Sequence, residues 1–559
     1  MSGAELLVDL LLRKGVSTIF GYPGGAVLPV YDALFDCEGL EHILVRHEQA
    51  AVHAADGYAR ATGSVGVTLV TSGPGATNAI TGIATAFMDS IPLIVLTGQV
   101  PTDMIGLDSF QEVDIYGMTM SITKHNYIVM NKSDLPRIID EAFYLATTGR
   151  PGPVLIDLPK NVMMDTTPII YEISEQQSFV SIRGYSVANQ SNGNDLDTMA
   201  EKLRNAARPL LLIGGGCVAG ETPSLLLNLA ERLDLPVAST LMGIGAFPSD
   251  HPLHLGMVGM HGTVAANRAI QAADVLVCLG VRFSDRVTGK RRAFSPHSYK
   301  IQVDIDEAEF DKNIEMDLAL CDSITNVLQE MLNRLSDRKI PEWHDQINEW
   351  SRCPIQPFRD HHESRLTPQD VIRYVDHATV SDAIISTDVG QHQIWTAHHY
   401  NFKKPRTFLT SGGLGTMGYG FPAAIGAAVA FPERQVVCIS GDGSFQMNMQ
   451  EIMTAVDLQL NVKVVILKNG YLGMVRQWQE LFLNKRYSAV QISSPDFAAL
   501  AKSFGAQGYQ VSTKEEAKAI IQHAMNTEGP AIMEFDVIEE TNVYPIVPPG
   551  ASNDESIEG

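Results

Sequence analysis

The chain has 559 residues, and its 64 aspartates and glutamates outnumber its 41 lysines and arginines, giving a formal charge of −23 at pH 7. This acidity, without any run rich in lysine or arginine, argues against nucleic acid as a partner. The six cysteines form no C-x-x-C pair, so neither a zinc knuckle nor a disulfide framework is expected. No leader pattern opens the chain and no apolar run approaches about 18 residues, which predicts a cytoplasmic protein with no membrane association.

Short runs rich in valine, isoleucine and leucine alternate with longer helical patterns. Buried parallel strands joined by crossover helices produce this alternation. In chain order, we expect strands near residues 43–45, 65–71, 93–97, 154–158, 210–213, 275–279, 301–305, 436–440 and 462–467. Polar stretches at roughly residues 172–195 and 342–368 are interpreted as linkers.

We therefore predict an α/β fold of three consecutive doubly wound parallel-sheet domains. The predicted domains are residues 1–172, 190–340 and 365–540, and a tail follows at 541–559. The acidic end, residues 553–559, is expected to be solvated. At about 100–200 residues per domain, the length also predicts three or four domains.

The first and third domains contain similar segments. Ala54–Gly57 leads through an apolar strand to Ser72–Gly75, and Ala423–Gly426 leads through another to Ser440–Gly443. A repeated βα unit and a chance similarity both remain open. If the repeat is real, only the third domain offers a carboxylate in its glycine-rich loop, because a proline takes that position in the first.

Glu48 follows the expected strand at residues 43–45 and precedes a helix of small residues. Such an acid could simply cap the helix. In a dry pocket, its pKa could instead rise toward neutrality and suit it to proton transfer. An HExxH zinc site is excluded, because Ala51 stands where the second histidine would be required.

Two expected strands of the third domain end in polar residues. The strand at 436–440 ends in Gly441-Asp442-Gly443, and the strand at 462–467 ends in Lys468-Asn469-Gly470. Joined by one helix, these strands would be parallel neighbours with Asp442 and Asn469 at their carboxyl ends, where open α/β sheets bind ligands. A carboxylate and an amide oxygen suit Mg²⁺, and glycines before a helix beginning near Ser444 suit a diphosphate. An isolated Asp-Gly is usually only a turn, so the prediction depends on the whole arrangement.

This arrangement resembles the thiamine-diphosphate signature, in which an asparagine usually stands where this chain has Lys468. A broader resemblance, from near residue 2 to about residue 550, is to the catalytic subunits of the acetohydroxyacid synthase family, of the bacterial biosynthetic type because no transit peptide precedes the match. It is carried, in the family's order, by Phe20–Ala26, Arg46–Gln49, Thr71–Gly75, Phe110–Glu112, Gly149–Pro153, Gly256–Thr263, Val389–Gln393 and Gly473–Trp478.

The resemblance implies three cofactors: thiamine diphosphate, Mg²⁺ and FAD. It makes Glu48 the base that controls the tautomer of the aminopyrimidine. The residues implied to bind thiamine diphosphate are, besides Glu48, Gln391, His392, Met417, Gly441, Gly443, Ser444 and Tyr471. The implied metal ligands are Asp442, Asn469 and the backbone oxygen of Tyr471.

The resemblance also assigns residues to the substrates. Gly25 and Gln111 would border the reacting carbon, and Lys160 and Phe110 would line the substrate channel. Arg286 would bind the carboxylate of a second 2-oxoacid, a role that suits a guanidinium. Trp478 would contact that acid's ethyl group and favour 2-oxobutyrate, although its spacing alone would fit a core aromatic.

The middle domain would carry FAD in a structural role. The implied residues are Arg150, Thr240, Leu241, His261, Arg282, Asp304 and Asp322. The family usually has an aspartate where this chain has Ser284. A G-x-G-x-x-A pattern at residues 214–219 is a weak dinucleotide signal, because the next strand ends without the acid that a ribose requires.

The implied activity is that of an acetolactate synthase in branched-chain amino acid biosynthesis. Such an enzyme decarboxylates pyruvate and ligates the two-carbon unit to pyruvate or 2-oxobutyrate. The implied partners are a second copy of the chain, in a homodimer or homotetramer, and a small regulatory subunit. A flavin-reducing pyruvate oxidase and a non-catalytic homologue are the alternatives.

Overall fold

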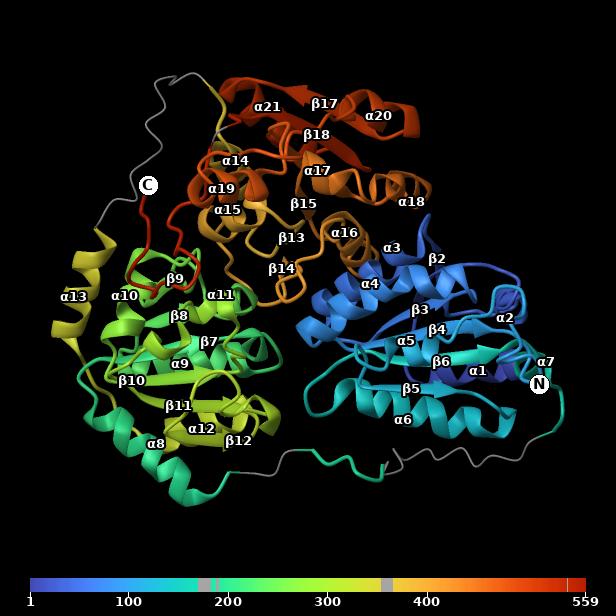
Figure 1. Cartoon of the computed structure of the whole chain (residues 1–559), viewed down its shortest axis with the longest axis horizontal. Helices are drawn as coiled ribbons and strands as arrows, with labels where there is room; N and C mark the ends of the chain where they lie inside the picture. Colours follow the sequence, from blue (N-terminus) through green and yellow to red (C-terminus); the bar gives the residue numbers. More distant parts are fainter. Residues whose placement is uncertain (169–181, 188–190, 353–364, 540) are drawn as a thin grey trace.

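The computed structural model describes residues 1–168, 182–187, 191–352, 365–539 and 541–559. Three six-stranded sheets follow one another along the chain, and every pairing between their strands is parallel (Figure 1). The α/β fold with three doubly wound domains is therefore confirmed. Within the described ranges, every helix is too short or too polar to span a bilayer. Cys353 lies outside these ranges, and the other five cysteines are free.

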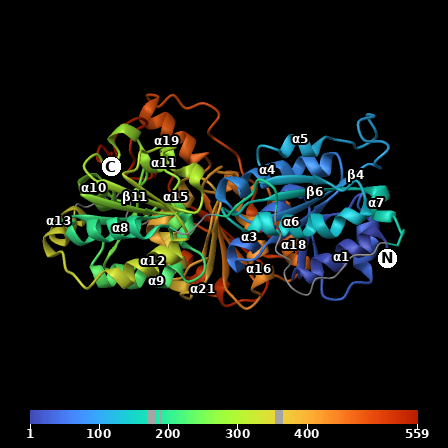
Figure 2. The ribbon, with the colours of Figure 1, turned by 90° about the horizontal axis from the view of Figure 1, so that it is seen from below.

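The first sheet has the order β2-β1-β3-β4-β6-β5. Its central strands are buried on both faces, because α1 and α6 cover one face and α3, α4 and α5 the other (Figure 2). The elements are β1 (Thr18–Tyr22), β2 (Glu41–Leu44), β3 (Gly66–Val70), β4 (Leu93–Gln99), β5 (His125–Ile128), β6 (Val154–Pro159), α1 (Gly3–Arg13), α2 (Leu28–Phe35), α3 (Glu48–Thr62), α4 (Pro74–Asp89), α5 (Ile115–Thr119), α6 (Leu135–Thr147) and α7 (Lys160–Met164).

The second sheet has the order β12-β11-β10-β7-β8-β9, so the strand order reverses between β7 and β10. A doubly wound sheet binds ligands at such a reversal. The elements are β7 (Pro209–Ile213), β8 (Val237–Ser239), β9 (His254–Met257), β10 (Val275–Leu279), β11 (Tyr299–Asp304), β12 (Leu318–Cys321), α8 (Gly193–Asn205), α9 (Thr222–Leu233), α10 (Val264–Ala272), α11 (Asp285–Thr288), α12 (Ile324–Arg334) and α13 (Pro341–Ser351).

Helix α13 lies within the stretch that the sequence suggested as the second linker. It packs on the central domain through buried Trp343 and Ile347, and the Trp343 indole N–H donates to the carbonyl oxygen of Pro209 at 3.0 Å. The sequence did not indicate this helix, because the stretch is mostly polar and only one side of the helix is apolar. Most of the first linker, and residues 353–364 of the second, lie outside the described residues.

The third sheet has the order β14-β13-β15-β16-β18-β17, the same pattern as the first sheet. The elements are β13 (Ile384–Thr387), β14 (Phe408–Leu409), β15 (Val436–Gly441), β16 (Val462–Lys468), β17 (Gln507–Val511), β18 (Ala531–Asp536), α14 (Pro368–Ala378), α15 (Gln391–His399), α16 (Gly420–Ala430), α17 (Asp442–Phe445), α18 (Ile452–Asp457), α19 (Gly473–Phe482), α20 (Phe497–Phe504) and α21 (Lys514–Met525).

The repeated segments of the first and third domains contact each other. Helices α3 and α16 approach so closely that a Cβ atom on Gly57 would collide with the backbone of Ala423, and one on Gly426 with the carbonyl oxygen of Ala54. This reciprocal contact and the shared strand order confirm the repeat suggested by the sequence. The two glycines are required because only a residue without a side chain permits this backbone approach.

The end of the chain is not a free tail, and the prediction that residues 553–559 are solvated is wrong for its first residue. Asn553 is fully buried, and its side-chain amide donates to the carbonyl oxygen of Val287 at 3.0 Å. Arg268 pairs with Glu558 at 3.0 Å, although Asp554 and Glu555 are exposed. The last residues therefore pack on the central domain (Figure 1).

Replacing Gly426 by alanine should destabilise the chain. The added methyl group must displace the α3 backbone, and such overpacking costs about 1–3 kcal/mol. Thermal unfolding followed by circular dichroism should show a lower midpoint for Gly426→Ala. Gly193→Ala is the control, because a Cβ on this exposed helical glycine meets no atom within 4 Å. Equal midpoints for the two variants would refute the close contact.

Candidate active site

A pocket lies at the carboxyl ends of β15 and β16. These strands are parallel neighbours, with Gly441 in register with Leu467. Asp442 begins α17 directly after β15, and Asn469 follows β16; both line the pocket. The sequence spacing therefore placed these two side chains correctly at one sheet edge.

Asp442 is almost completely buried. One of its carboxylate oxygens accepts hydrogen bonds from the Gly470 N–H and the Ser494 hydroxyl, both at 3.1 Å. Burial raises the pKa of the carboxyl group, because the charged form has lost water. A cation beside it would favour the charged form again. Across the described ranges no three histidine, cysteine, aspartate or glutamate side chains gather, so a cation here would also need amide, backbone or ligand oxygens.

His392 lines the same pocket from the start of α15. The ring is buried, and its Nε2 atom has no hydrogen-bond partner among the described residues. Burial lowers the pKa of His392 to about 3, so the ring is neutral at pH 7. Buried polar atoms nearly always have a partner, so this nitrogen suits a bound ligand. Gly441 lies against the ring, where any side chain would crowd it.

Gln391 is held by its neighbours. Its side-chain amide donates to the Gln477 side chain at 2.9 Å and to the carbonyl oxygen of Thr541 at 3.1 Å. Gln477 in turn donates to the carbonyl oxygen of Val543 and accepts from its N–H, at 2.9 and 2.8 Å. The segment after β18, at residues 541–543, therefore helps to hold Gln391 at the pocket. Gln477 stands beside Trp478 in a segment used for the resemblance, but no local pattern indicated its contacts.

Three further predicted residues line the pocket: Met417, Gly443 and Ser444. The Met417 side chain lies 3.9 Å from the position that a Cβ on Gly443 would occupy. The Ser444 hydroxyl donates to the carbonyl oxygen of Val389 at 3.2 Å. Tyr471 lines the pocket as well, and its N–H donates to the side-chain oxygen of Asn469 at 3.1 Å.

Arg286 and Trp478 meet although they belong to different domains. The guanidinium carbon of Arg286, in α11, lies 5.6 Å from the centre of a Trp478 ring in α19. This is a cation–π contact. Trp478 also packs edge-on against Phe482 at 5.4 Å. Arg286 also pairs with the exposed Asp285 at 3.3 Å and remains 59% exposed, so a ligand can still reach its guanidinium.

Glu48 and Gln111 lie on the first domain around one glycine-rich loop. Glu48 begins α3 and accepts a hydrogen bond from the Asn78 amide at 2.9 Å. A Cβ on Gly75 would lie 3.3 Å from the Glu48 carboxylate, and one on Gly73 would lie 2.8 Å from the Gln111 carbonyl oxygen. The loop therefore brings together two residues that are far apart in the sequence.

Of the other residues predicted for the substrates on the first domain, Gly25 and Phe110 are open to solvent and Lys160 is half-buried. Gly25 has space around it, and Lys160 begins α7 directly after β6. Phe110 is 88% exposed. Neither Glu48 nor these residues line the pocket around Asp442, whose lining comes from residues 389–537. One chain thus presents the two groups of predicted residues at separate places.

Glu451 was not indicated by the sequence. Its carboxylate is fully buried in the third domain and accepts a hydrogen bond from the Arg46 N–H, at 2.9 and 3.2 Å to its two oxygens. Burial raises the pKa of Glu451 to about 7. Because Arg46 stands two residues before Glu48, this contact fixes the strand end that carries Glu48.

The residues predicted for FAD lie mostly at the carboxyl ends of the central strands. Asp304 ends β11, and burial raises its pKa to about 6. Asp322 follows β12 and accepts a hydrogen bond from the Ser191 N–H at 2.8 Å. Thr240 and Leu241 follow β8.

Three of the residues predicted for FAD contact neighbouring parts of the chain. Arg150 reaches from the first domain and pairs with Asp306 at 3.3 Å. Arg282 reaches from the central domain to the first domain and donates to the carbonyl oxygen of Met88. The His261 ring lies 3.2 Å from the carbonyl oxygen of Pro545.

The glycines of the G-x-G-x-x-A pattern have a packing role. A Cβ on Gly214 would collide with the carbonyl oxygen of Gly280, and one on Gly216 would lie 3.0 Å from the Gly280 Cα. The Gly214 N–H donates to the carbonyl oxygen of Leu279 at 2.9 Å and is not free for a phosphate. The pattern is thus explained by the approach of two loops.

Comparison with protein families agrees with the fold and the pocket. The chain matches the thiamine pyrophosphate enzyme N-terminal TPP binding domain over residues 1–118, the central domain over 196–331 and the C-terminal TPP binding domain over 388–535. Fold and pocket thus define a thiamine pyrophosphate enzyme.

Comparison with individual relatives identifies the family within this class of enzymes. The chain is 43% identical to the acetolactate synthase large subunit of Haemophilus influenzae, over 100% of this chain and 98% of the relative. It is 44% identical to the acetolactate synthase isozyme 3 large subunit of Escherichia coli, over 99% and 98%. It is 47% identical to a probable acetolactate synthase large subunit of Methanocaldococcus jannaschii, over 98% and 94%. The chain belongs to the acetolactate synthase large subunit family.

Replacing Gln477 by leucine should release the segment after β18. The substitution leaves the Val543 N–H and carbonyl groups without their partner, at about 1–3 kcal/mol per buried group, and removes one of the two acceptors of the Gln391 amide. Hydrogen exchange with mass spectrometry should show faster exchange across residues 541–548. Gln479→Leu is the matched control, because Gln479 lies on the same helix and bonds Ser488. Equal exchange in both variants would show that Gln477 does not hold this segment.

Proposed function

We propose that the chain is the catalytic subunit of an acetolactate synthase. It decarboxylates pyruvate and ligates the two-carbon unit to a second 2-oxoacid, forming 2-acetolactate from pyruvate or 2-aceto-2-hydroxybutyrate from 2-oxobutyrate. The observation that carries the proposal is the pocket around Asp442, Asn469 and His392, in a chain 42–47% identical to named acetolactate synthases.

The pocket residues fit thiamine diphosphate with Mg²⁺. Asp442, Asn469 and the Tyr471 backbone oxygen would supply three oxygens to the cation, and the diphosphate would supply others. The unpartnered Nε2 of His392 and the N–H groups beside Gly441 and Gly443 would bind the diphosphate. Gln391 would help to shape this end of the pocket. When bound, thiamine diphosphate supplies the nucleophilic carbon and the electron sink for loss of CO₂.

Glu48 would hold a proton at the aminopyrimidine ring. Its hydrogen bond from Asn78 fixes the direction of the carboxylate. Because Glu48 does not line the pocket of its own chain, a second copy would have to bring its Glu48 there. A homodimer is therefore the smallest unit we propose, and a homotetramer is compatible with it. By similarity to proteins named large subunits, a small regulatory subunit would complete the enzyme.

Arg286 and Trp478 would bind the second 2-oxoacid. The guanidinium would hold the carboxylate, and the indole would contact the alkyl group beside it. Their cation–π contact keeps the two groups in one place. Gly25 and Gln111 would border the reacting carbon from the partner's first domain, and Lys160 and Phe110 would line the route to it.

FAD would lie on the central domain near Arg150, Arg282 and Asp304. The support is that Arg282 and Asp304 lie at the carboxyl ends of central strands, and that Arg150 reaches this edge from the first domain, where it pairs with Asp306. Thr240, Leu241, His261 and Asp322 would complete the site. Where the family usually has an aspartate, this chain has Ser284, which is the N-cap residue directly before α11.

The proposed activity is tested by adding thiamine diphosphate, Mg²⁺ and FAD singly and in combination to stripped protein, with pyruvate alone or with 2-oxobutyrate. Acetolactate should form without oxygen and should require thiamine diphosphate and Mg²⁺. Product formation that requires reduction of the flavin would instead identify a pyruvate oxidase. Binding of thiamine diphosphate without any turnover would identify a non-catalytic homologue.

Glu48→Gln should lose most of its turnover. The amide cannot share a proton with the aminopyrimidine, and loss of such a group typically costs about 10²–10⁴-fold. Calorimetry should still detect magnesium-dependent uptake of thiamine diphosphate, because the diphosphate pocket is unchanged. Glu41→Gln, on the exposed start of β2, serves as control and should keep its activity. Wild-type turnover in Glu48→Gln would remove Glu48 from the mechanism.

A further inference from the structure

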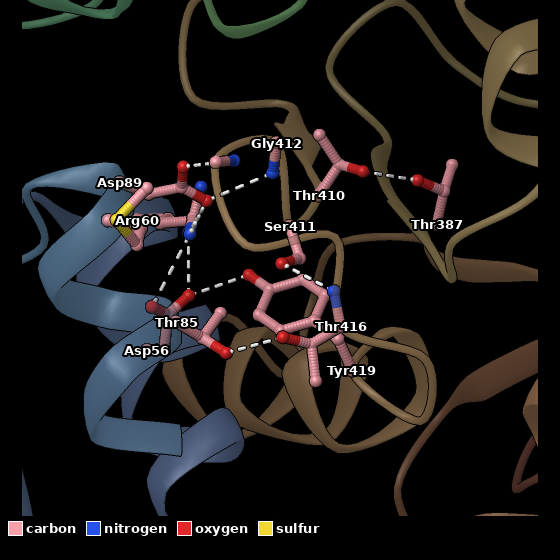
Figure 3. A network of polar contacts seen from close by, with 12 residues as sticks. Asp56, Arg60, Thr85, Asp89, Thr387, Thr410, Ser411, Gly412, Thr416 and Tyr419 are labelled. Carbon is pink, nitrogen blue, oxygen red and sulfur yellow. Dashed lines mark hydrogen bonds and ion pairs between the residues drawn. The ribbon is translucent and has the colours of Figure 1, made fainter. Parts of the chain in front are cut away.

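The loop that carries Met417 is anchored from two domains (Figure 3). We call residues 410–419, between β14 and α16, the Met417 loop. On the side of the third domain, the Gly418 N–H donates to the Asp388 carboxylate at 2.7 Å, and the hydroxyls of Thr410 and Thr387 lie 2.7 Å apart. These contacts fix the two ends of the loop.

The middle of the loop depends on the first domain. The last residue of α4, Asp89, accepts hydrogen bonds from the Gly412 and Gly413 N–H groups, at 3.0 and 2.7 Å. One turn earlier, the Thr85 hydroxyl lies 2.7 Å from the Thr416 hydroxyl. Thr85 is fully buried and the Asp89 side chain is fully buried. These contacts are therefore shielded from solvent.

A network of charges holds Asp89 in place. Arg60 of α3 donates to Asp89 at 2.8 Å and to Asp56 at 2.6 Å, and Asp56 also accepts the Tyr419 hydroxyl at 2.6 Å (Figure 3). Arg282 of the central domain approaches Asp89 at 3.7 Å. Opposite charges surround the carboxylate, so its position is fixed before any ligand binds.

Met417 directly follows Thr416 and lines the pocket beside His392 and Gly441. The position of the Met417 side chain is therefore set by two contacts with the first domain. Thr85 holds the neighbouring Thr416, and Asp89 holds the loop a few residues earlier. The third domain supplies the pocket wall, but the first domain of the same chain supplies its support.

We propose that Asp89 and Thr85 are positioning residues for the thiamine diphosphate pocket of their own chain, acting through the Met417 loop. The first domain would then have two roles: its Glu48 serves the pocket of the partner, and its α4 shapes its own. This inference rests on the proposed function. A purely structural role would stabilise the chain but would not depend on Met417.

The test compares Asp89→Asn and Thr85→Val with two controls of the same chemistry. Asp157→Asn alters a fully buried carboxylate that contacts Thr97 and Gln99 of the first domain, and Thr119→Val removes a buried hydroxyl from α5. Calorimetry on the full chain, with Mg²⁺ present, measures the dissociation constant of thiamine diphosphate. We expect it to rise at least about tenfold in Asp89→Asn, for loss of a charge-assisted hydrogen bond, and to stay near wild type in both controls.

A double-mutant cycle with Met417→Ala decides how the residues act. If they act through the loop, Asp89→Asn and Thr85→Val weaken binding much less in the Met417→Ala background than in the wild type. Equal effects in both backgrounds, or equal effects of the controls, would overturn the inference. Should Asp89→Asn not fold, the Thr85→Val cycle alone decides between these outcomes. Wild-type protein that takes up no thiamine diphosphate would refute the proposed function itself, a result distinct from the others.

Discussion

The close approach of helices α3 and α16 is the constraint on which the arrangement of the molecule depends. Gly57 and Gly426 allow each backbone to lie against the other helix, so neither domain can rotate without opening the contact. Beside this contact, Asp56 and Arg60 of α3 meet Tyr419 at the start of α16. A packing contact without side chains and a buried polar network therefore fix the same two domains. The sheet edges that carry the predicted site residues of these two domains therefore have a defined position relative to each other.

The groups needed for the proposed chemistry are divided among the three domains. The third domain holds the oxygens and nitrogens suited to a metal diphosphate, and the first holds Glu48 on a separate loop. The central domain contributes Arg286, which meets Trp478 across a domain boundary. Such a division makes the relative position of the domains part of the site itself. It also explains why buried polar contacts, such as that between Glu451 and the Arg46 N–H, occur between domains and not only within them.

Features that depend on local pattern were predictable from the sequence, whereas features made by distant contacts were not. Strand periodicity indicated the three sheets, and the spacing of Asp442 and Asn469 placed them on adjacent strand ends, because parallel strands follow simple connection rules. Helix α13 was missed because its polar face dominates its composition. Three features were missed because residues far apart in the chain make these contacts. They are the packing of Asn553, the hydrogen bond between Gln477 and Val543, and the hydrogen bonds that Asp89 accepts.

The bond between Gln391 and the carbonyl oxygen of Thr541 spans 150 positions of the chain. During synthesis, domains generally fold as units in order from the N-terminus, and the third domain is the last of the three. The side chain of Gln391 nevertheless gains this partner only when residues 541–543 have emerged. The hydrogen bonds that hold Gln391 at the pocket therefore form only when nearly the whole polypeptide has been made.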